Sequence, residues 1–131
     1  MNILATDMDG TFLDHLGSYD KVRLDKLLDA CEAKNYVFTV ASGRSLLALE
    51  ELFDGFVDRI AIIAENGALV QYKGEVLFES KLEPKDYLEI ADTTSALPTC
   101  EGILLSGRRG AYAPEDADPA YLKAMERYYE N

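Results

Sequence analysis

The first half of the chain alternates between short apolar runs and longer segments in which leucines recur at intervals of three and four. The apolar runs are Asn2–Thr6, Tyr36–Ala41 and Ile60–Ala64. Each run ends abruptly at polar residues, a pattern that predicts a buried strand. The segments between them predict two helices, one beginning after Ser18 or Asp20 and one spanning about Ser45–Phe53. This alternation favours a parallel sheet with right-handed crossovers.

The spacing of apolar residues also predicts which helix faces are buried. In the first helix these residues are Leu24, Leu27, Leu28 and Cys31. In the second helix they are Leu46, Leu49 and Phe53. Asn35 is expected to end the first helix, because asparagine tolerates the left-handed conformation found at helix C-termini.

The pattern changes after Glu65. Lys73-Gly74 predicts a hairpin turn between strands at Ala68–Tyr72 and Glu75–Ser80. The next expected elements are a helix at Pro84–Ala96, short strands at Ile103–Ser106 and Ala111–Tyr112, and a last helix capped by Asp118-Pro119 with Leu122, Met125 and Tyr129 on one face. We place a domain boundary near Lys81–Pro84, which gives a first domain over residues 1–82 and a second over 83–131.

Charge and composition narrow the functional class. The formal net charge is -11 and the pI is about 4.4, so the surface repels nucleic acid and anionic lipid. No apolar run approaches the roughly 20 residues of a membrane helix, and no secretory signal is recognisable, so we expect a cytoplasmic protein. We expect Cys31 and Cys100 to be reduced. A single histidine, His15, excludes a multi-histidine metal site.

The most informative segment is Asp7-Met8-Asp9-Gly10-Thr11, directly after the first predicted strand. Ligands of parallel α/β sheets bind beyond the carboxyl ends of the strands. Two neighbouring carboxylates repel each other unless a cation or a proton lies between them, and their oxygens suit Mg²⁺. The alternative is an acidic turn that ends a strand, but the complete run after an apolar strand favours a site.

Two further polar segments follow the next two strands. Ser42-Gly43-Arg44 follows the second strand, and Glu65-Asn66-Gly67-Ala68 follows the third. Ser42 would bind a phosphate oxygen, with Gly43 allowing close approach and the first amides of the second helix facing the anion. The alternatives are Ser42 as a plain helix cap with Arg44 in solvent, and a simple Asn-Gly turn at Asn66.

These segments resemble motifs of the haloacid dehalogenase superfamily. Asp7–Leu13 resembles the first motif, DxDGTL, with Phe12 in place of the usual leucine. The resemblance implies that Asp7 is the nucleophile that forms an aspartyl-phosphate and that Asp9 is the general acid/base. It also implies that Mg²⁺ is held by the Asp7 side chain and the Asp9 carbonyl. Ser42-Gly43-Arg44 resembles the second motif, so the phosphate-binding set would be Ser42, Gly43, Arg44, Gly10 and Thr11.

The Glu65–Ala68 segment resembles the ENGA element of the Cof-like branch, in which Asn66 would lie near the substrate. The branch has a three-layer Rossmann-like parallel sheet core with an inserted α/β cap. The fold class expected here is therefore α/β, a truncated core of this kind followed by a partial cap. Arg108 and Arg109 are more typical of a solvated turn than of a substrate contact.

Two motifs of the superfamily have no match in this sequence. One is a lysine that steadies the nucleophile and phosphate, and the other is a late acidic motif that supplies a Mg²⁺ ligand. Because positioning of charge does most of the catalysis in phosphoryl transfer, we expect weak or no turnover by this chain alone. We also expect the first strand to be a sheet edge with an exposed apolar flank, which favours a homo-oligomer or a complementing C-terminal half as partner.

The sequence therefore predicts a Mg²⁺-dependent phosphatase of small phosphorylated metabolites, such as sugar phosphates. One alternative is a non-catalytic fragment that keeps the fold and acts by association. A receiver-like phospho-acceptor domain is a weaker alternative, because such domains lack DxDGT followed by SGR.

Overall fold

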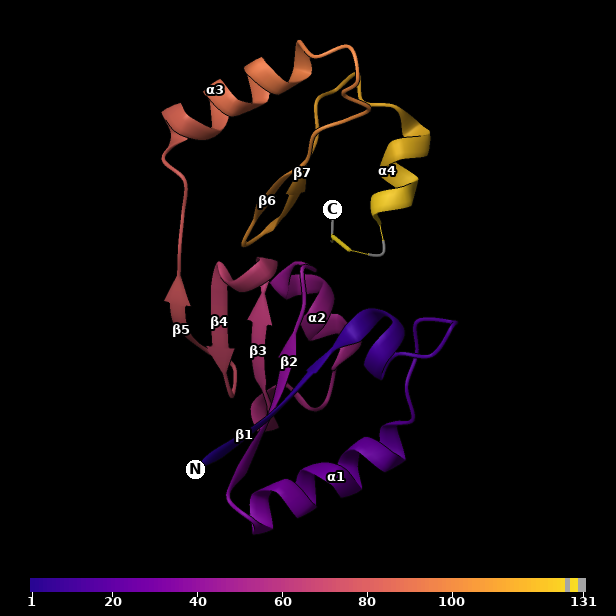
Figure 1. Cartoon of the computed structure of the whole chain (residues 1–131), viewed down its shortest axis with the longest axis vertical. Coiled ribbons are helices and arrows are strands. Elements are labelled where there is room, and N and C mark those ends of the chain that lie inside the picture. Colours follow the sequence, from indigo (N-terminus) through magenta and orange to yellow (C-terminus); the bar gives the residue numbers. More distant parts are fainter. Residues whose placement is uncertain (127, 130–131) are drawn as a thin grey trace.

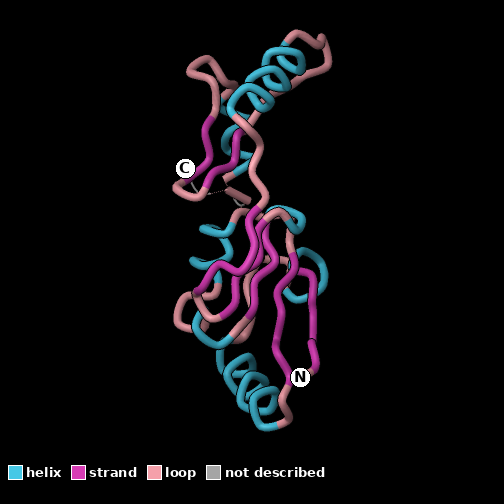
Figure 2. Tube along the Cα trace, turned by 90° about the vertical axis from the view of Figure 1, so that its left-hand side faces the viewer, coloured by secondary structure: helices cyan, strands magenta, loops and turns pink. Residues whose placement is uncertain are grey.

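The molecule consists of two bodies stacked along its long axis (Figures 1 and 2). The structure is a computed structural model that describes residues 1–126, 128 and 129. The lower body contains a five-stranded sheet with its helices. The upper body contains a two-stranded sheet, two helices and the residues described after the second of them. The first body includes the N-terminus, and the chain crosses once to the second between residues 79 and 84.

The large sheet has the strand order β1-β2-β3-β4-β5. Strands β1 (Asn2–Asp7), β2 (Tyr36–Ala41) and β3 (Ala61–Ala64) are parallel, and β4 (Leu69–Tyr72) and β5 (Glu75–Glu79) form the predicted antiparallel hairpin. Lys73 and Gly74 both have positive φ, 52° and 80°, as a two-residue hairpin turn requires. The predicted α/β core with a parallel sheet is confirmed.

Helices α1 (Lys21–Ala33) and α2 (Leu46–Leu52) pack on one face of this sheet, where they share a single hydrophobic cluster with β2 and β3. The predicted α2 face is buried at all three positions, and Asn35 has φ 58° as expected. Leu27 is a correction, since 36% of it is exposed while Leu24, Leu28 and Cys31 are buried. It lies at the margin of the α1 stripe, beyond the reach of the sheet.

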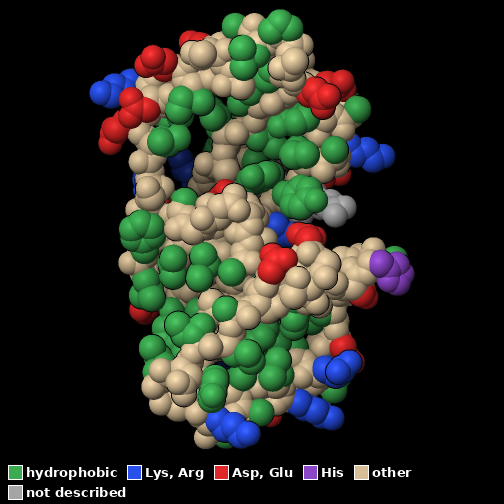
Figure 3. Space-filling model, in the orientation of Figure 1, with side chains coloured by type: hydrophobic (Ala, Val, Ile, Leu, Met, Phe, Trp, Pro, Cys, Tyr) green, Lys and Arg blue, Asp and Glu red, His purple; other side chains and the backbone are tan. Residues whose placement is uncertain are grey.

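Strand β1 is also a correction, since it was predicted to be buried. Ile3 is 65% exposed and Leu4 is 41% exposed, because within the described residues only β2 pairs with β1. The prediction of an edge strand with an exposed apolar flank is confirmed. Figure 3 shows hydrophobic side chains gathered over the surface of the lower body.

The upper body begins with α3 (Pro84–Ser95), followed by the hairpin of β6 (Leu105–Gly107) and β7 (Gly110–Tyr112) and by α4 (Pro119–Met125). The Asp118 side chain caps α4 through Ala120 N–H, as predicted. Strand β6 begins two residues later than expected, because its pairing with β7 is centred on the Arg108-Arg109 turn. Tyr129 lies beyond the end of α4. The division at residue 82 stays a prediction.

Cys31 and Cys100 are both free thiols. Within the described ranges, no helix combines the length and apolarity needed to cross a bilayer.

Candidate active site

The loop after β1 presents two carboxylates to solvent. Met8, between them, is fully buried, so its side chain anchors the loop while Asp7 and Asp9 stay exposed. Gly10 has φ 75°, a conformation that other residues adopt at a cost, and Leu13 N–H closes the turn onto Met8 O at 3.0 Å. Thr11 Oγ1 donates to Asp7 Oδ2 at 3.3 Å. The loop geometry is therefore fixed by one buried side chain and one glycine.

The Ser42 loop lies beside it at the same edge of the sheet. Asp7 pairs with Ala41 in the β1–β2 register, so Ser42 follows directly after the partner of Asp7. Ser42 Oγ accepts a hydrogen bond from Arg44 N–H at 3.2 Å. The cap of α2 is Ser45, whose Oγ accepts from Ala48 N–H at 3.2 Å. The alternative interpretation of Ser42 as a plain helix cap is therefore wrong.

Arg44 joins the two loops. Its Nη2 donates to Asp9 Oδ1 at 2.7 Å and its Nε donates to Asp9 Oδ2 at 3.2 Å, which is a bidentate ion pair. The Arg44 side chain is only 9% exposed, whereas that of Asp9 is 40% exposed. The alternative interpretation, in which Arg44 is solvated, is therefore wrong. A phosphate-binding role for Arg44 stays a prediction.

The Glu65-Asn66-Gly67 turn supports the Ser42 loop from the other side. Glu65 and Asn66 both have left-handed backbones, with φ 52° and 54°. Glu65 N–H donates to Arg44 O at 3.0 Å, and Asn66 N–H donates to Ser42 O at 3.2 Å. A Cβ on Gly43 would lie 2.8 Å from Asn66 Oδ1, so a side chain there would displace Asn66. Asn66 therefore packs against the Ser42 loop, and its place near a substrate stays a prediction.

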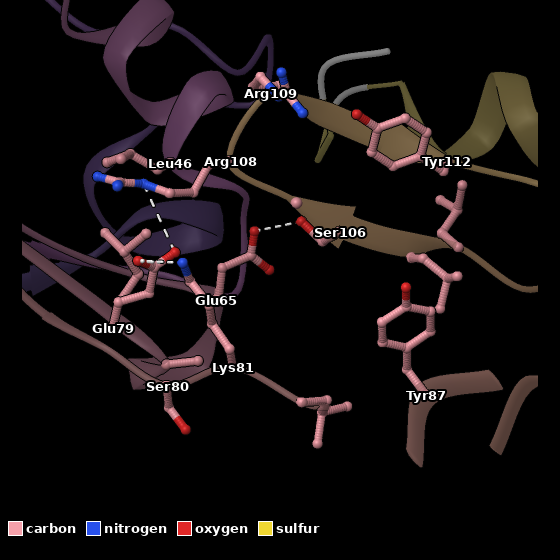
Figure 4. A pocket seen from close by; sticks show the side chains of 16 residues that line it. Leu46, Glu65, Glu79, Ser80, Lys81, Tyr87, Ser106, Arg108, Arg109 and Tyr112 are labelled. Carbon is pink, nitrogen blue, oxygen red and sulfur yellow. Dashed lines mark hydrogen bonds and ion pairs between the residues drawn. The ribbon is translucent and has the colours of Figure 1, made fainter. Parts of the chain in front are cut away.

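Two residues of the upper body that the sequence analysis did not assign to the site, Ser106 and Tyr128, contact this region. Glu65 Oε1 accepts a hydrogen bond from Ser106 Oγ in β6 (Figure 4). The Arg44 guanidinium carbon lies 5.6 Å from the centre of the Tyr128 ring, and Ser45 N–H donates to Tyr128 O at 2.9 Å. Glu65 belonged to the ENGA segment and was recognisable. Ser106 and Tyr128 carried no sequence signal.

A cavity of about 1170 Å³ lies between the two bodies, and Figure 3 shows the hollow between them. It is lined by Glu65, the end of β5, the linker to α3, Tyr87 and the β6–β7 hairpin (Figure 4). Glu79 lies on its wall, 3.2 Å from Lys81 Nζ and 3.7 Å from Arg108 Nε. Neither Asp7 nor Ser42 lines it. The cavity is therefore separate from the candidate catalytic residues, although Glu65 contributes to both regions.

The donor atoms in the loop fit a hard divalent cation in part. Among the described residues, no group of three or more histidine, cysteine or acidic side chains gathers around one point. The family resemblance assigns two oxygen donors to the metal, the Asp7 carboxylate and the Asp9 carbonyl. Mg²⁺ commonly takes only one or two protein carboxylates and completes its shell with water and substrate phosphate. A two-ligand site of this kind is compatible with the loop.

The chain is similar to known phosphatases and solved structures along nearly its whole length. It is 30% identical over 129 residues to the 5-amino-6-(5-phospho-D-ribitylamino)uracil phosphatase YbjI of Escherichia coli (strain K12), covering 98% of this chain and 47% of that protein. The crystal structure of SMU.1108c from Streptococcus mutans UA159 matches with 28% identity and a TM-score of 0.88, over 98% of this chain and 48% of that one. A haloacid dehalogenase-like hydrolase from B. subtilis, 19% identical with a TM-score of 0.74, matches in fold over 95% of this chain and 43% of that chain.

The chain thus spans about half the length of the relatives it matches. The family described as haloacid dehalogenase-like hydrolase matches residues 4–131. The resemblance seen in the Asp7, Ser42 and Glu65 segments is thereby confirmed, and the chain belongs to the haloacid dehalogenase-like hydrolases.

Proposed function

We propose that this protein is a Mg²⁺-dependent phosphatase of small phosphorylated metabolites that works through an aspartyl-phosphate. The observation that carries the proposal is the Arg44–Asp9 ion pair, with its 2.7 Å Nη2–Oδ1 bond. This pair ties the loop of Asp7 and Asp9 to the loop of Ser42, at the strand ends where parallel sheets bind ligands. A carboxylate nucleophile, a second carboxyl group and a hydroxyl are thus available on two adjacent loops.

The chemistry follows from these groups in two steps. An oxygen of Asp7 attacks phosphorus, and the bond from phosphorus to the ester oxygen breaks. Asp9, protonated on one oxygen whose hydrogen bond from Arg44 is released, gives that proton to the departing alcohol. Asp9 then takes a proton from water, the water oxygen attacks phosphorus, and the bond to Asp7 breaks to release inorganic phosphate. Ser42 would hold a non-bridging phosphate oxygen throughout. Atoms and protons balance, and Asp7 returns to its starting state.

A divalent cation would supply charge neutralisation for the phosphoryl group when bound. The Asp7 carboxylate and the Asp9 carbonyl would hold it. Because the chain carries a net charge of -11, an anionic substrate meets an unfavourable overall field. Local positive charge at this loop is therefore needed, and Arg44 supplies part of it.

The substrate class is inferred from the curated relative. The Escherichia coli protein is named for a phosphate monoester on a ribityl chain, so a phosphorylated sugar-like metabolite is the class that we propose here. The superfamily lysine and late acidic motif have no counterpart in this sequence. We therefore expect turnover by this chain alone to be weak, and a non-catalytic role is the competing outcome.

Hydrolysis of a generic aryl phosphate, measured with and without Mg²⁺, tests the proposal. Turnover that requires Mg²⁺, is abolished by Asp7→Asn and persists in Asp92→Asn would support it. Asp92 is a matched control because it is an exposed aspartate of α3, away from the loop. Turnover that survives Asp7→Asn would overturn the assigned nucleophile. No Mg²⁺-dependent turnover in the intact chain would favour the non-catalytic alternative.

A further inference from the structure

Two separate contacts from the upper body meet at Arg44, the residue that holds Asp9. We infer that Arg44 is a positioning residue through which the placement of the upper body sets the orientation of the Asp9 carboxylate. The functional meaning of this inference rests on the proposed role of Asp9. The mechanical coupling itself does not require turnover.

The first contact comes from the segment after α4. Tyr128 places its ring 5.6 Å from the Arg44 guanidinium carbon, a distance typical of a cation–π interaction. Its carbonyl also accepts the N–H of Ser45, the residue next to Arg44. Both interactions come from one residue of the upper body, and both act on adjacent residues of the lower body.

The second contact runs through Glu65. Ser106 in β6 donates to the Glu65 carboxylate, and the Glu65 backbone N–H donates to Arg44 O at 3.0 Å. Glu65 holds a left-handed backbone, φ 52°, which is unfavourable for a non-glycine residue and persists only where the surrounding contacts enforce it. The Ser106 bond at one end of Glu65 and the Arg44 bond at the other are contacts that would enforce it.

A movement of the upper body can reach Asp9 through Arg44 because the Arg44 guanidinium is almost fully buried and paired with Asp9. With 9% of its side chain exposed, the guanidinium depends on its carboxylate partner, and separating the two would leave a buried charge poorly compensated. The bidentate fork also fixes both oxygens of Asp9, so rotation of the guanidinium must rotate the carboxylate or break a bond. Arg44 and Asp9 therefore move together.

Hydrogen exchange at the Arg44 Nε–H, followed by NMR on the whole chain, tests this coupling. The resonance is assigned by its loss in Arg44→Lys. We expect Ser106→Ala, which loses a hydrogen bond, and Tyr128→Ala, which loses the cation–π contact but keeps the backbone carbonyl, each to raise the exchange rate of the Arg44 Nε–H about five-fold. The amides of residues 9–11 should exchange faster in the same variants.

The chain supplies its own controls. Arg59 Nε also donates to a carboxylate, Glu32, but it lies far along the lower body, so its exchange rate should not change. Ser95→Ala removes an exposed serine of α3 and should leave Arg44 unaffected. Unchanged Arg44 exchange in both Ser106→Ala and Tyr128→Ala would overturn the inference. Equal acceleration at Arg44 and Arg59 would also overturn it, because it would indicate general destabilisation.

Discussion

At the scale of single residues, the site depends on close packing between two loops. Gly43 lies so near the Asn66 side chain that a Cβ would come within 2.8 Å of Oδ1 and 3.2 Å of Nδ2. Contacts this short force one group to move, and the Asn66 amide, at the end of an exposed side chain, is the group that can move. Asn66 is itself constrained, since its N–H bonds to Ser42 O and its backbone is left-handed.

We therefore predict that Gly43→Ala destabilises the chain by about 0.5–1 kcal/mol, because the added methyl group displaces the Asn66 side chain, and that Asn66→Gly relieves most of this cost. Glycine at position 66 keeps the left-handed backbone while removing the side chain that the added methyl group at position 43 would meet. Urea unfolding of both single variants and the double variant forms a mutant cycle. Strict additivity would show that the two positions do not touch and would contradict the packing.

The residues of the candidate site differ in how far the sequence could predict them. Asp7, Asp9 and Ser42 follow strands directly, so the rule that ligands bind at strand ends locates them without coordinates. The partner of Arg44 could not be predicted in this way. Its fork to Asp9 and its contact with Tyr128 join segments far apart in the chain, and nothing in spacing or composition pairs Arg44 with either residue.

At the scale of elements, α1 is held at its N-terminus and along its exposed side. The Asp20 carboxylate accepts from Val22 N–H at 2.9 Å and Arg23 N–H at 3.0 Å, which satisfies two otherwise unpaired amides. Arg59 clamps the same helix by three ion pairs, to Asp25, Asp29 and Glu32 at 2.7–2.9 Å. Hydrogen bonds to Glu32, then Asp29, raise the Arg59 pKa above its usual range.

We predict that Asp20→Ala lowers the free energy of unfolding by about 1 kcal/mol, because two N-terminal amides of α1 lose their acceptor. Ser18→Ala is the matched comparison, since Ser18 was the other cap candidate and makes no side-chain bond to the helix in the described residues. Its effect should stay within about 0.5 kcal/mol. Thermal or urea unfolding measures both, and a larger loss in Ser18→Ala would contradict the capping geometry.

The elements themselves were predictable where periodicity and capping agree. Helix α1 carries both kinds of signal, and the Lys73-Gly74 hairpin carries a turn signal between two apolar runs. The burial of β1 was not predictable from its own composition, because an apolar run gives no information on how many neighbouring strands flank it. The bounds of the short β6 strand also differ from the predicted ones, since they depend on pairing with β7 rather than on local propensity.

At the scale of the whole molecule, an exposed edge strand competes with a large net charge. Ile3 and Leu4 are 65% and 41% exposed on β1, and the unpaired edge of a strand can bind the edge of another chain. The net charge of -11 opposes such contacts between copies. Salt screens this repulsion over about 8 Å at physiological ionic strength, so the balance should shift toward association as salt increases.

We therefore predict that the chain self-associates through β1, with an average mass by light scattering that rises with both protein and salt concentration. Ile3→Lys should reduce this association, because a lysine on an edge strand blocks pairing of two edges. Leu88→Lys is the matched control, since it makes the same change in charge at an exposed leucine, 53% exposed, on α3. If both variants weaken association equally, the effect is one of charge and β1 is not the contact. A monomer at every protein and salt concentration would mean that the repulsion of the net charge outweighs the exposed edge.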